Sequence, residues 1–358
     1  MTRTRQLRRA IATTAASPTL GARSAARLFE RAQAVCRRRR PTFSGFTALV
    51  VLILAPSLAP SSGGVTRAAS IPLGDYAGPR NPAGIARFAT ATGTHPSLAT
   101  EFLDGADGWP GLVNVGGLGA WRSSGYTLVL AVPLLPRHAT NSLAAGARGA
   151  YNRRFATLAR NLVSQGFGNA YLRLGWEFNG NWYKWRVRSA SSAVNYATFF
   201  RNVVTSMRSV PGQSFRFVWN PNDSGPSSYS PEQAYPGNAY VDYVGSDIYA
   251  NCWCRPFTAQ NGWAAQLSQP WGLNWLASFA AEMGKPIVFP EWGVDFRSDG
   301  HGLGDDPYFV DHLAAWVDSH NVAWTSAFSF DGTHMTDVTD MTDGRFPNSL
   351  AAFRADFG

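Results

Sequence analysis

Two glutamates in this 358-residue chain follow short apolar runs and could work together as acid and base. Glu177 lies in YLRLGWEFNGNWYKW (171–185) and Glu291 in KPIVFPEWGVD (285–295). Each run is typical of a buried strand, and each carboxylate comes where the strand gives way to a loop. Tryptophans follow both glutamates, at Trp182, Trp185 and Trp292. Carboxylates on rigid strand ends beside flat aromatic rings indicate chemistry on a sugar.

Elements that could position these acids alternate along the chain after residue 70. Amphipathic patterns predict helices that bury one apolar face, as in residues 151–165, 195–210, 273–283 and 307–317. Short segments rich in Val, Leu and Phe predict strands that are buried on both faces. Eight such strands are expected, at residues 71–75, 97–103, 127–133, 170–176, 215–220, 243–249, 286–291 and 323–330.

This alternation predicts a single α/β domain over residues 70–358, folded as a (β/α)8 TIM barrel. A doubly wound open sheet is the alternative. Such a sheet usually has a glycine fingerprint after its first strand. The glycines that follow residues 113–115 do not form that fingerprint.

The order of the strands brings the two glutamates together at one end of the barrel. By this count Glu177 ends strand four and Glu291 ends strand seven, which face each other across the carboxyl-terminal mouth. A retaining glycosidase needs two carboxyl groups about 5–5.5 Å apart. One must be protonated and the other ionised. Burial and like-charge repulsion in a shared cavity separate their pKa values in this way.

Residues 173–185 and 286–295 resemble the two active-site signatures of glycoside hydrolase family 26. That family consists of retaining (β/α)8 enzymes, mostly endo-β-mannanases with some β-glucanases and β-xylanases. The resemblance implies that Glu177 is the acid/base and Glu291 the nucleophile. By the same resemblance, Arg173 corresponds to the family's arginine, and Asp247 and Tyr249 correspond to an acid and a tyrosine near the nucleophile. The loop that follows the acid/base corresponds to Asn179, Gly180, Trp182 and Trp185.

Substrate contacts are expected around this pair. Arg173 is expected to position Glu291, and the Tyr249 hydroxyl either bonds that carboxylate or packs in the core. The family has histidine where this chain has Trp176, and an indole with one donor and no acceptor cannot reproduce histidine's hydrogen bonds. The residues predicted to bind substrate are Arg173, Trp176, Asn179, Trp182, Trp185, Asn220, Asp247, Tyr249 and Trp292, with Trp253 and Trp263 at distal subsites.

These features predict a retaining glycoside hydrolase that cleaves a β-linked polysaccharide, with β-mannan as the first substrate. A β-1,3/1,4-glucanase or a xylanase is the alternative on the same scaffold. Two other classes remain open: a non-catalytic carbohydrate-binding protein and a surface-anchored interaction protein. No cofactor and no metal are expected, and we expect a monomer.

The N-terminal 69 residues differ sharply from the rest of the chain. They contain 12 Arg and one acid, whereas residues 70–358 contain 20 Lys and Arg against 22 Asp and Glu. The positive charge therefore lies outside the expected domain, which argues against a nucleic acid partner. Arginines at 37–40 precede the apolar run 46–55, which is too short to span a bilayer. We predict a signal peptide cleaved near residues 66–69 and a secreted or cell-surface protein, with an uncleaved anchor as the alternative. The true start codon is left open.

Two cysteines lie in the expected domain. Cys252 and Cys254 could form a disulfide after export or could be two free thiols. With no nearby histidine pair, they do not form a zinc site.

Overall fold

The structure is a computed structural model that describes residues 71–137, 140–224, 229–331 and 337–358. The predicted N-terminal basic segment and signal peptide, residues 1–69, lie outside the described residues, and the domain boundary remains a prediction. Among the described residues, no helix has the length and apolarity needed to cross a membrane.

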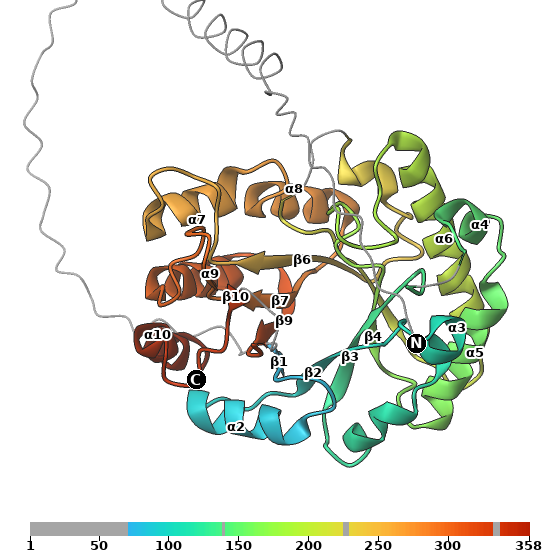
Figure 1. Cartoon of the computed structure of the whole chain (residues 1–358), viewed down its shortest axis with the longest axis horizontal. Helices are drawn as coiled ribbons and strands as arrows, with labels where there is room; N and C mark the ends of the chain where they lie inside the picture. Colours follow the sequence, from blue (N-terminus) through green and yellow to red (C-terminus); the bar gives the residue numbers. More distant parts are fainter. Residues whose placement is uncertain (1–70, 138–139, 225–228, 332–336) are drawn as a thin grey trace, which may run out of the picture. The chain divides into compact units, whose positions relative to one another are not determined.

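Eight parallel strands close into a barrel in the order β1-β2-β3-β4-β5-β6-β7-β9. The predicted (β/α)8 barrel is thus confirmed, and each predicted strand corresponds to one strand of the barrel. Helices lie around the outside of the strands (Figure 1). The strands are β1 (Leu73–Tyr76), β2 (Leu98–Phe102), β3 (Thr127–Val132), β4 (Tyr171–Leu174), β5 (Arg216–Trp219), β6 (Tyr243–Tyr249), β7 (Ile287–Gly293) and β9 (Val322–Phe328).

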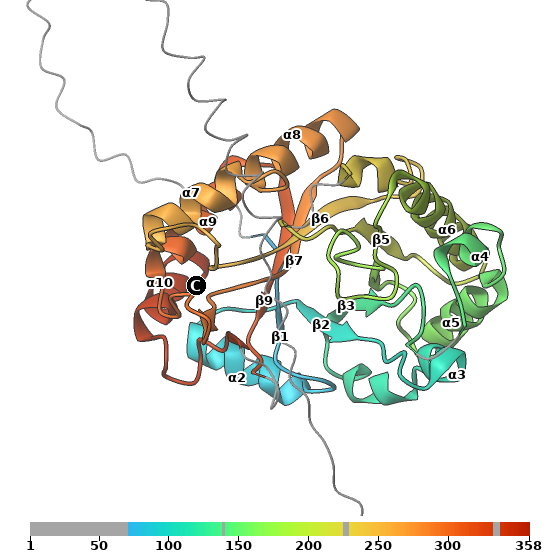
Figure 2. The ribbon, with the colours of Figure 1, turned by 45° about the horizontal axis from the view of Figure 1, so that its top comes forward.

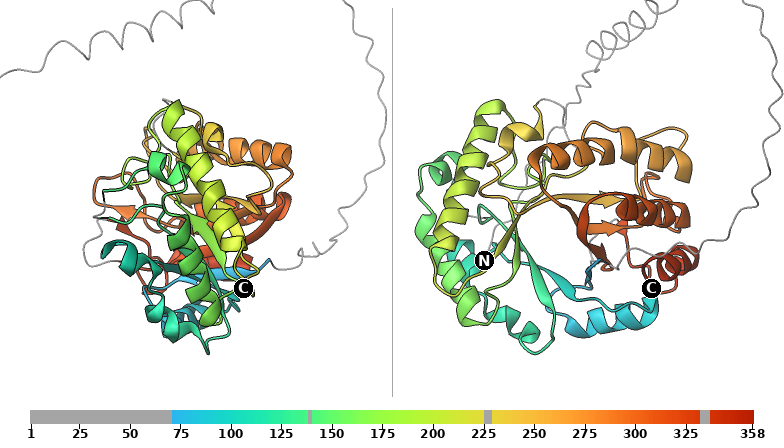
Figure 3. Two further views of the ribbon diagram at one scale, coloured as in Figure 1. Left: turned by 90° about the vertical axis from the view of Figure 1, so that its right-hand side faces the viewer. Right: turned by 180° about the vertical axis from the view of Figure 1, so that it is seen from behind.

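The helices follow the strands as the sequence pattern requires, and two further views show them outside the barrel (Figure 3). They are α2 (Pro82–Thr92), α3 (Gly108–Val113), α4 (Leu143–Ala147), α5 (Asn152–Ser164), α6 (Ala190–Arg208), α7 (Ala259–Ser268), α8 (Leu273–Met283), α9 (Pro307–Ser319) and α10 (Pro347–Phe357). Short 3-10 helices η2 (Gly116–Trp121) and η3 (Pro231–Ala234) and an antiparallel pair, β8 (Phe296–Arg297) and β10 (Asp337–Val338), lie in the connections.

Helix α6 shows how local sequence fixes these elements. Ser189 caps its amino end, and Ser192 completes a capping box because its Oγ accepts a hydrogen bond from the backbone N–H of Ser189. One face of the helix is buried, and the ring of Phe199 packs directly beneath Gly146 of α4. A Cβ atom on Gly146 would lie 2.4 Å from that ring, so the glycine permits the close approach of α4 and α6.

The barrel interior changes from apolar to polar along its axis. The amino-terminal layer is hydrophobic, and β2, β3, β5, β7 and β9 contribute Leu98, Val129, Val218, Val288 and Trp324 to it. Farther toward the carboxyl ends, the Thr100 and Ser326 hydroxyls lie 2.7 Å apart and hydrogen-bond across β1. Gly74 of β1 leaves room for this contact, because a Cβ there would lie 3.2 Å from the Oγ atom of Ser326. Figure 2 shows the strands of the barrel from an oblique angle.

Strand β4 is shorter than predicted, ending at Leu174 rather than at residue 176. The chain turns at Gly175 and Glu177, whose φ angles of 56° and 49° lie in the left-handed region. Such angles end the regular strand. Glu177 therefore stands on a turn beyond β4, while Glu291 lies within β7.

Replacing Phe199 with alanine should destabilise the protein, because the ring is fully buried between α4, α5 and α6. We expect the free energy of unfolding to fall by about 3–5 kcal/mol. Chemical denaturation followed by circular dichroism measures it. Val194→Ala on the same helix is the control. Its side chain is 60% exposed, and a change below about 0.5 kcal/mol is expected. Equal losses in the two variants would contradict this packing.

Candidate active site

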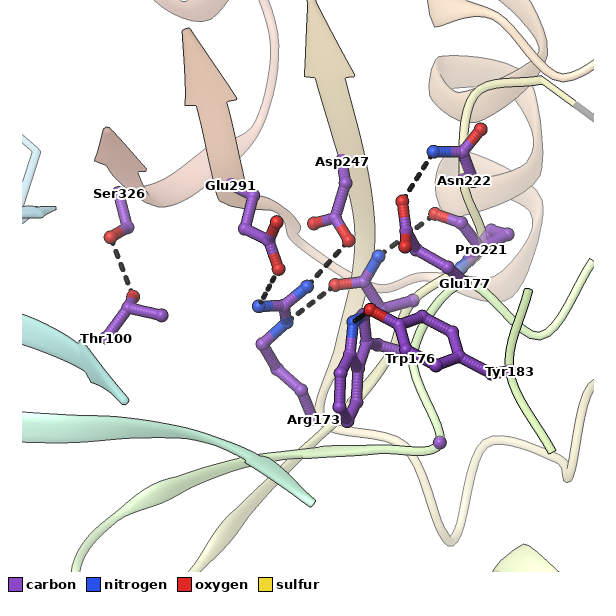
Figure 4. Close-up of polar contacts among 12 residues, drawn as sticks. Thr100, Arg173, Trp176, Glu177, Tyr183, Pro221, Asn222, Asp247, Glu291 and Ser326 are labelled. Carbon is purple, nitrogen blue, oxygen red and sulfur yellow. Dashed lines mark hydrogen bonds and ion pairs between the residues drawn. The ribbon is translucent and has the colours of Figure 1, made fainter. Parts of the chain in front are cut away.

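The guanidinium of Arg173 on β4 lies at the centre of the candidate site (Figure 4). Its side chain is fully buried and donates three hydrogen bonds. Nη1 donates to Oε1 of Glu291 over 2.7 Å, Nη2 to Oδ2 of Asp247 over 2.6 Å, and Nε to Oδ1 of Asn220 over 2.9 Å. One cation thus connects the carboxyl ends of β4, β5, β6 and β7.

This burial corrects three predicted substrate contacts. Arg173, Asn220 and Asp247 have no exposed surface, so their side chains cannot touch a sugar in this conformation. Asn220 and Asp247 hold the guanidinium of Arg173, which in turn orients Glu291 as expected.

Glu291 is held through both of its carboxylate oxygens. Arg173 donates to Oε1, and the hydroxyl of Tyr249 donates to Oε2 over 3.1 Å. Tyr249, predicted either to bond this carboxylate or to pack in the core, makes the hydrogen bond and lines the cleft. Donors on two sides fix the direction in which the carboxylate points.

Glu177 is held by a different set of contacts. Its strained backbone, of a kind that costs about 1–3 kcal/mol, is secured by a 2.7 Å hydrogen bond from its N–H to the carbonyl oxygen of Asn220. Its Oε1 accepts from Nδ2 of Asn222 over 2.6 Å, and its Oε2 accepts from Nε1 of Trp182 over 2.9 Å. Both donors are neutral.

The surroundings of Glu177 favour its protonated form. Burial, and then the negative charge of Glu291, raise the pKa of Glu177 to about 7, although Trp182, Asn222 and Arg173 act in the opposite direction. The site therefore contains one carboxyl group that can hold a proton near neutral pH and one that faces a permanent cation.

Asn179 supports Glu177 indirectly. Its Nδ2 donates to the carbonyl oxygens of Asn222 and Ser224, over 2.8 and 3.0 Å, and its Oδ1 accepts from the N–H of Asn222. Because Asn179 is buried, the prediction that it binds substrate is wrong. It fixes the loop after β5, which carries the Asn222 donor.

Only one of the three predicted stacking tryptophans is exposed. Trp182 is 51% exposed and lines the cleft beside Glu177. Trp185 is 4% exposed and stacks on Tyr183, with its Nε1 donating to the carbonyl oxygen of Trp176. The expectation that the Trp185 ring stacks on a sugar is therefore wrong.

Trp292 is fully buried on the outside of the barrel, where its ring stacks on Phe353 of α10. Successive side chains of a strand point to opposite faces. Because Glu291 points to the mouth of the barrel, its neighbour Trp292 must point toward the helices. The prediction that Trp292 binds substrate is wrong for this reason.

Trp176 is almost buried as well, and its Nε1 donates to the hydroxyl of Tyr183 over 3.0 Å. Its ring packs edge-on against Phe102. Its one donor is thus engaged within the protein, and Trp176 supports the wall of a cleft that Tyr183 also lines.

The two glutamates line one cleft of about 580 Å³, referred to below as the catalytic cleft. Sequence reasoning missed several of its residues, because their positions depend on loops that meet only in the fold. Asp223 is one, and burial raises its pKa to about 7. Further lining residues that were not predicted are Phe102, Tyr183, Asn222, Ser224, Asn251, Asp295, Arg297, Phe328 and Thr339.

Trp253 stands at another part of the catalytic cleft and is 63% exposed. It lies between Cys252 and Cys254, which the structure joins in a disulfide. The ring stacks on His301, and the guanidinium of Arg297 lies 5.5 Å from its centroid. Trp263, the other tryptophan assigned to a distal subsite, is buried against Phe309 and does not fit that role.

Trp182→Phe should raise the pKa of Glu177 further, because it removes the Nε1 donor to the carboxylate but keeps a ring. A hydrogen bond to a charged group contributes about 1.5–3 kcal/mol, which water will replace in part. Carbon-13 NMR of the glutamate carboxyl groups measures this pKa. Trp253→Phe is the matched control, because that ring stacks on His301. An unchanged or lowered pKa in Trp182→Phe would contradict the role assigned to Trp182.

Comparisons with known proteins agree with this geometry. Residues 146–289 match the family model described as glycosyl hydrolase family 26. The match includes Glu177 and stops within β7, just before Glu291. Endoglucanase H of Acetivibrio thermocellus is 27% identical over 202 residues, which are 52% of this chain and 20% of that protein. This chain thus spans about a fifth of the length of that relative.

Solved structures share the fold. A family 26 β-mannanase from Bacteroides ovatus superposes with a TM-score of 0.58 at 14% identity, covering 80% of this chain and 88% of that one. A modular endo-β-1,4-mannanase from Cellulomonas fimi gives a TM-score of 0.57 at 21% identity, covering 80% and 70%. The sequence resemblance to family 26 is thereby confirmed over residues 146–289, and the barrel of this chain has the fold of these solved structures.

Proposed function

We propose that this protein is a secreted, retaining glycoside hydrolase that cleaves a β-linked polysaccharide by double displacement. The observation that supports it most directly is the contrast between two carboxyl groups of one cleft. Burial raises the pKa of Glu177 to about 7, whereas Glu291 receives hydrogen bonds from a guanidinium and a phenol. An acid that holds its proton beside an oriented carboxylate is what this mechanism requires.

In the first step, the carboxyl proton of Glu177 moves to the glycosidic oxygen while a carboxylate oxygen of Glu291 bonds to the anomeric carbon. The bond between that carbon and the glycosidic oxygen breaks, and the leaving sugar departs as an alcohol. In the second step, Glu177 takes a proton from water and the water oxygen bonds to the anomeric carbon. The bond to Glu291 then breaks and restores its carboxylate.

We place β-mannan first among the substrates, because solved neighbours with the same fold are named as β-mannanases. A β-glucan is the alternative favoured by the name of the endoglucanase relative, and a xylan is the third. Trp182 and Trp253, both exposed at the catalytic cleft, supply faces on which sugar rings could stack. A reducing-sugar assay across mannan, mixed-linkage glucan and xylan tests this order.

Secretion remains a proposal that rests on the basic and apolar pattern of residues 37–55. The disulfide between Cys252 and Cys254 fits an oxidising compartment. Mass spectrometry of the mature protein tests it, and an N-terminus near residue 70 would support it.

Replacing either glutamate with alanine should stop hydrolysis. Glu177→Ala removes the acid, for which we expect a loss in kcat of about 10²–10⁴-fold. Glu291→Ala removes the nucleophile, so no glycosyl-enzyme can form. Release of reducing ends from the polysaccharide measures both. Glu282→Ala, an exposed acid on α8, is the control.

Full activity in either glutamate variant would contradict the assignment. A parent protein that binds polysaccharide but releases no reducing ends from any of them would favour the carbohydrate-binding alternative.

The pH dependence follows from Glu177. The first step uses its protonated form, so kcat/KM should fall as pH rises through about 7. Because folding raises this pKa above the unfolded value of about 4.3, the native state binds the proton more tightly. The stability contribution is present below the unfolded pKa and is lost as pH rises through about 7.

Initial rates measure the change in kcat/KM, and chemical denaturation measures the change in stability, both between about pH 4 and 9. The pKa of Asp223 is also raised to about 7, so Asp223→Asn is the matched control. The basic limb of kcat/KM should stay in place in that variant. A limb that disappears with Asp223 would show that Glu177 is not the titrating acid.

A further inference from the structure

A second and larger cleft lies beside the catalytic cleft. Its volume is about 970 Å³, and segments that follow β1, β2, β3 and β4 line it. The two clefts share Phe102, Trp182 and Tyr183 as lining residues, so a bound chain could pass from one into the other. We call the larger one the basic cleft, because four of its lining residues carry positive charge: Arg80, Arg137, Lys184 and Arg186.

Two acids also line the basic cleft, but other groups engage their carboxylates. Glu101 is 2% exposed and accepts from Nε1 of Trp121 over 3.1 Å and from the N–H of Arg80 over 2.6 Å. Asp104 accepts from the N–H of Ala106 over 2.7 Å. The basic cleft is thus lined by four cations and two acids. Both acids already accept hydrogen bonds from N–H groups of the protein.

Two of the cationic groups are held against the wall of the cleft. Nζ of Lys184 donates to the carbonyl oxygen of Arg137 over 3.2 Å, and Nη1 of Arg186 donates to the carbonyl oxygen of Tyr183 over 3.0 Å. The acceptor of Arg186 is a neutral carbonyl group, which does not cancel the charge of the guanidinium. Within the described part of the chain, Nε of Arg186 is buried and has no hydrogen-bond partner.

Charge is divided unevenly around the barrel, which strengthens the potential of the basic cleft. Residues 71–216, from β1 to the start of β5, contain 15 Lys and Arg and only five Asp and Glu. Residues 217–358 contain five Lys and Arg and 17 Asp and Glu. All four cations of the basic cleft belong to the first half. An excess of one sign of charge around a cleft attracts ligands of the opposite charge.

We propose that the basic cleft binds an anionic group carried by the polysaccharide, and that the substrate is an acidic β-glycan. The group is the carboxylate of a uronic acid or a phosphate ester on the sugar. The guanidinium and ammonium groups pair with this anion, while the rings of Phe102, Trp182 and Tyr183 contact the sugar that carries it. The proposal rests on the proposed function, because it names the class of glycan that enters the same active site.

The test measures binding to the full chain with Glu291→Gln, which prevents turnover. The probes are a β-mannan, the same polymer with part of its primary hydroxyls oxidised to carboxylates, and a phosphorylated sample of it. Isothermal titration at low and high salt should show the anionic polymers binding about tenfold more tightly than the neutral one at low salt. The difference should shrink at high salt. The tighter of the two anionic polymers assigns the carboxylate or the phosphate.

Arg186→Gln and Arg137→Gln, each added to Glu291→Gln, should reduce the preference for the anionic polymers several-fold. Two variants are used because Arg186 is half-buried and Arg137 is exposed, so a folding defect in one leaves the other informative. Arg160→Gln is the matched control. It removes a cation of the same half of the barrel from the outer surface of α5, and the preference should persist.

Equal binding of neutral and anionic polymers would overturn the proposal, as would a preference that survives in both cleft variants. This failure is distinct from failure of the proposed function. The parent protein, assayed on the neutral polymers, would still release reducing ends if only the acidic-glycan proposal were wrong.

Discussion

The active site depends on one buried cation. The guanidinium of Arg173 has no exposed surface, and a charge removed from water must be paired and fully hydrogen-bonded. Its partners are Glu291, Asp247 and Asn220, so it ties four strand ends together. One cation then faces three carboxyl groups, because Glu177 lies in the same site. Burial, with repulsion among these carboxyl groups, raises the pKa of both Asp247 and Glu177. The raised pKa of Glu177 lets its carboxyl group hold a proton near neutral pH.

The barrel can hold this buried charge because its interior changes from apolar to polar along the barrel axis. The amino-terminal layer packs through apolar side chains, among them Val129, Val218 and Val288. The hydrogen bond between Thr100 and Ser326 begins the polar part of the interior. Polar groups therefore collect where loops and N–H donors can satisfy them. The same gradient explains why Glu177 can adopt a left-handed backbone, since its N–H finds the Asn220 carbonyl oxygen.

Sequence reasoning predicted the eight strands and brought Glu177 and Glu291 to one cleft, because apolar runs are local and a barrel gathers the carboxyl ends of its strands at one mouth. It failed for Trp292 by reading proximity in sequence as proximity in space, although alternation along a strand already sends Trp292 away from Glu291. Trp185 could not have been assigned in this way, because only the folded loop stacks it on Tyr183. The role of Asn222 could not be predicted from the sequence for a similar reason. Its contact with Glu177 joins the loops after β4 and β5, and no periodicity along the chain encodes that approach.

The catalytic cleft adjoins two further hollows. It shares Trp182 and Tyr183 with the basic cleft, and it shares Ser224 and Trp253 with a smaller pocket near the disulfide. In the proposed mechanism, adjoining hollows of this kind would give sugar units places next to the bond that Glu177 and Glu291 cleave. A glutamate pair at a closed end would receive only a chain terminus. For the proposed hydrolase, the adjoining hollows would leave room for a substrate longer than the two sugars at the bond cleaved.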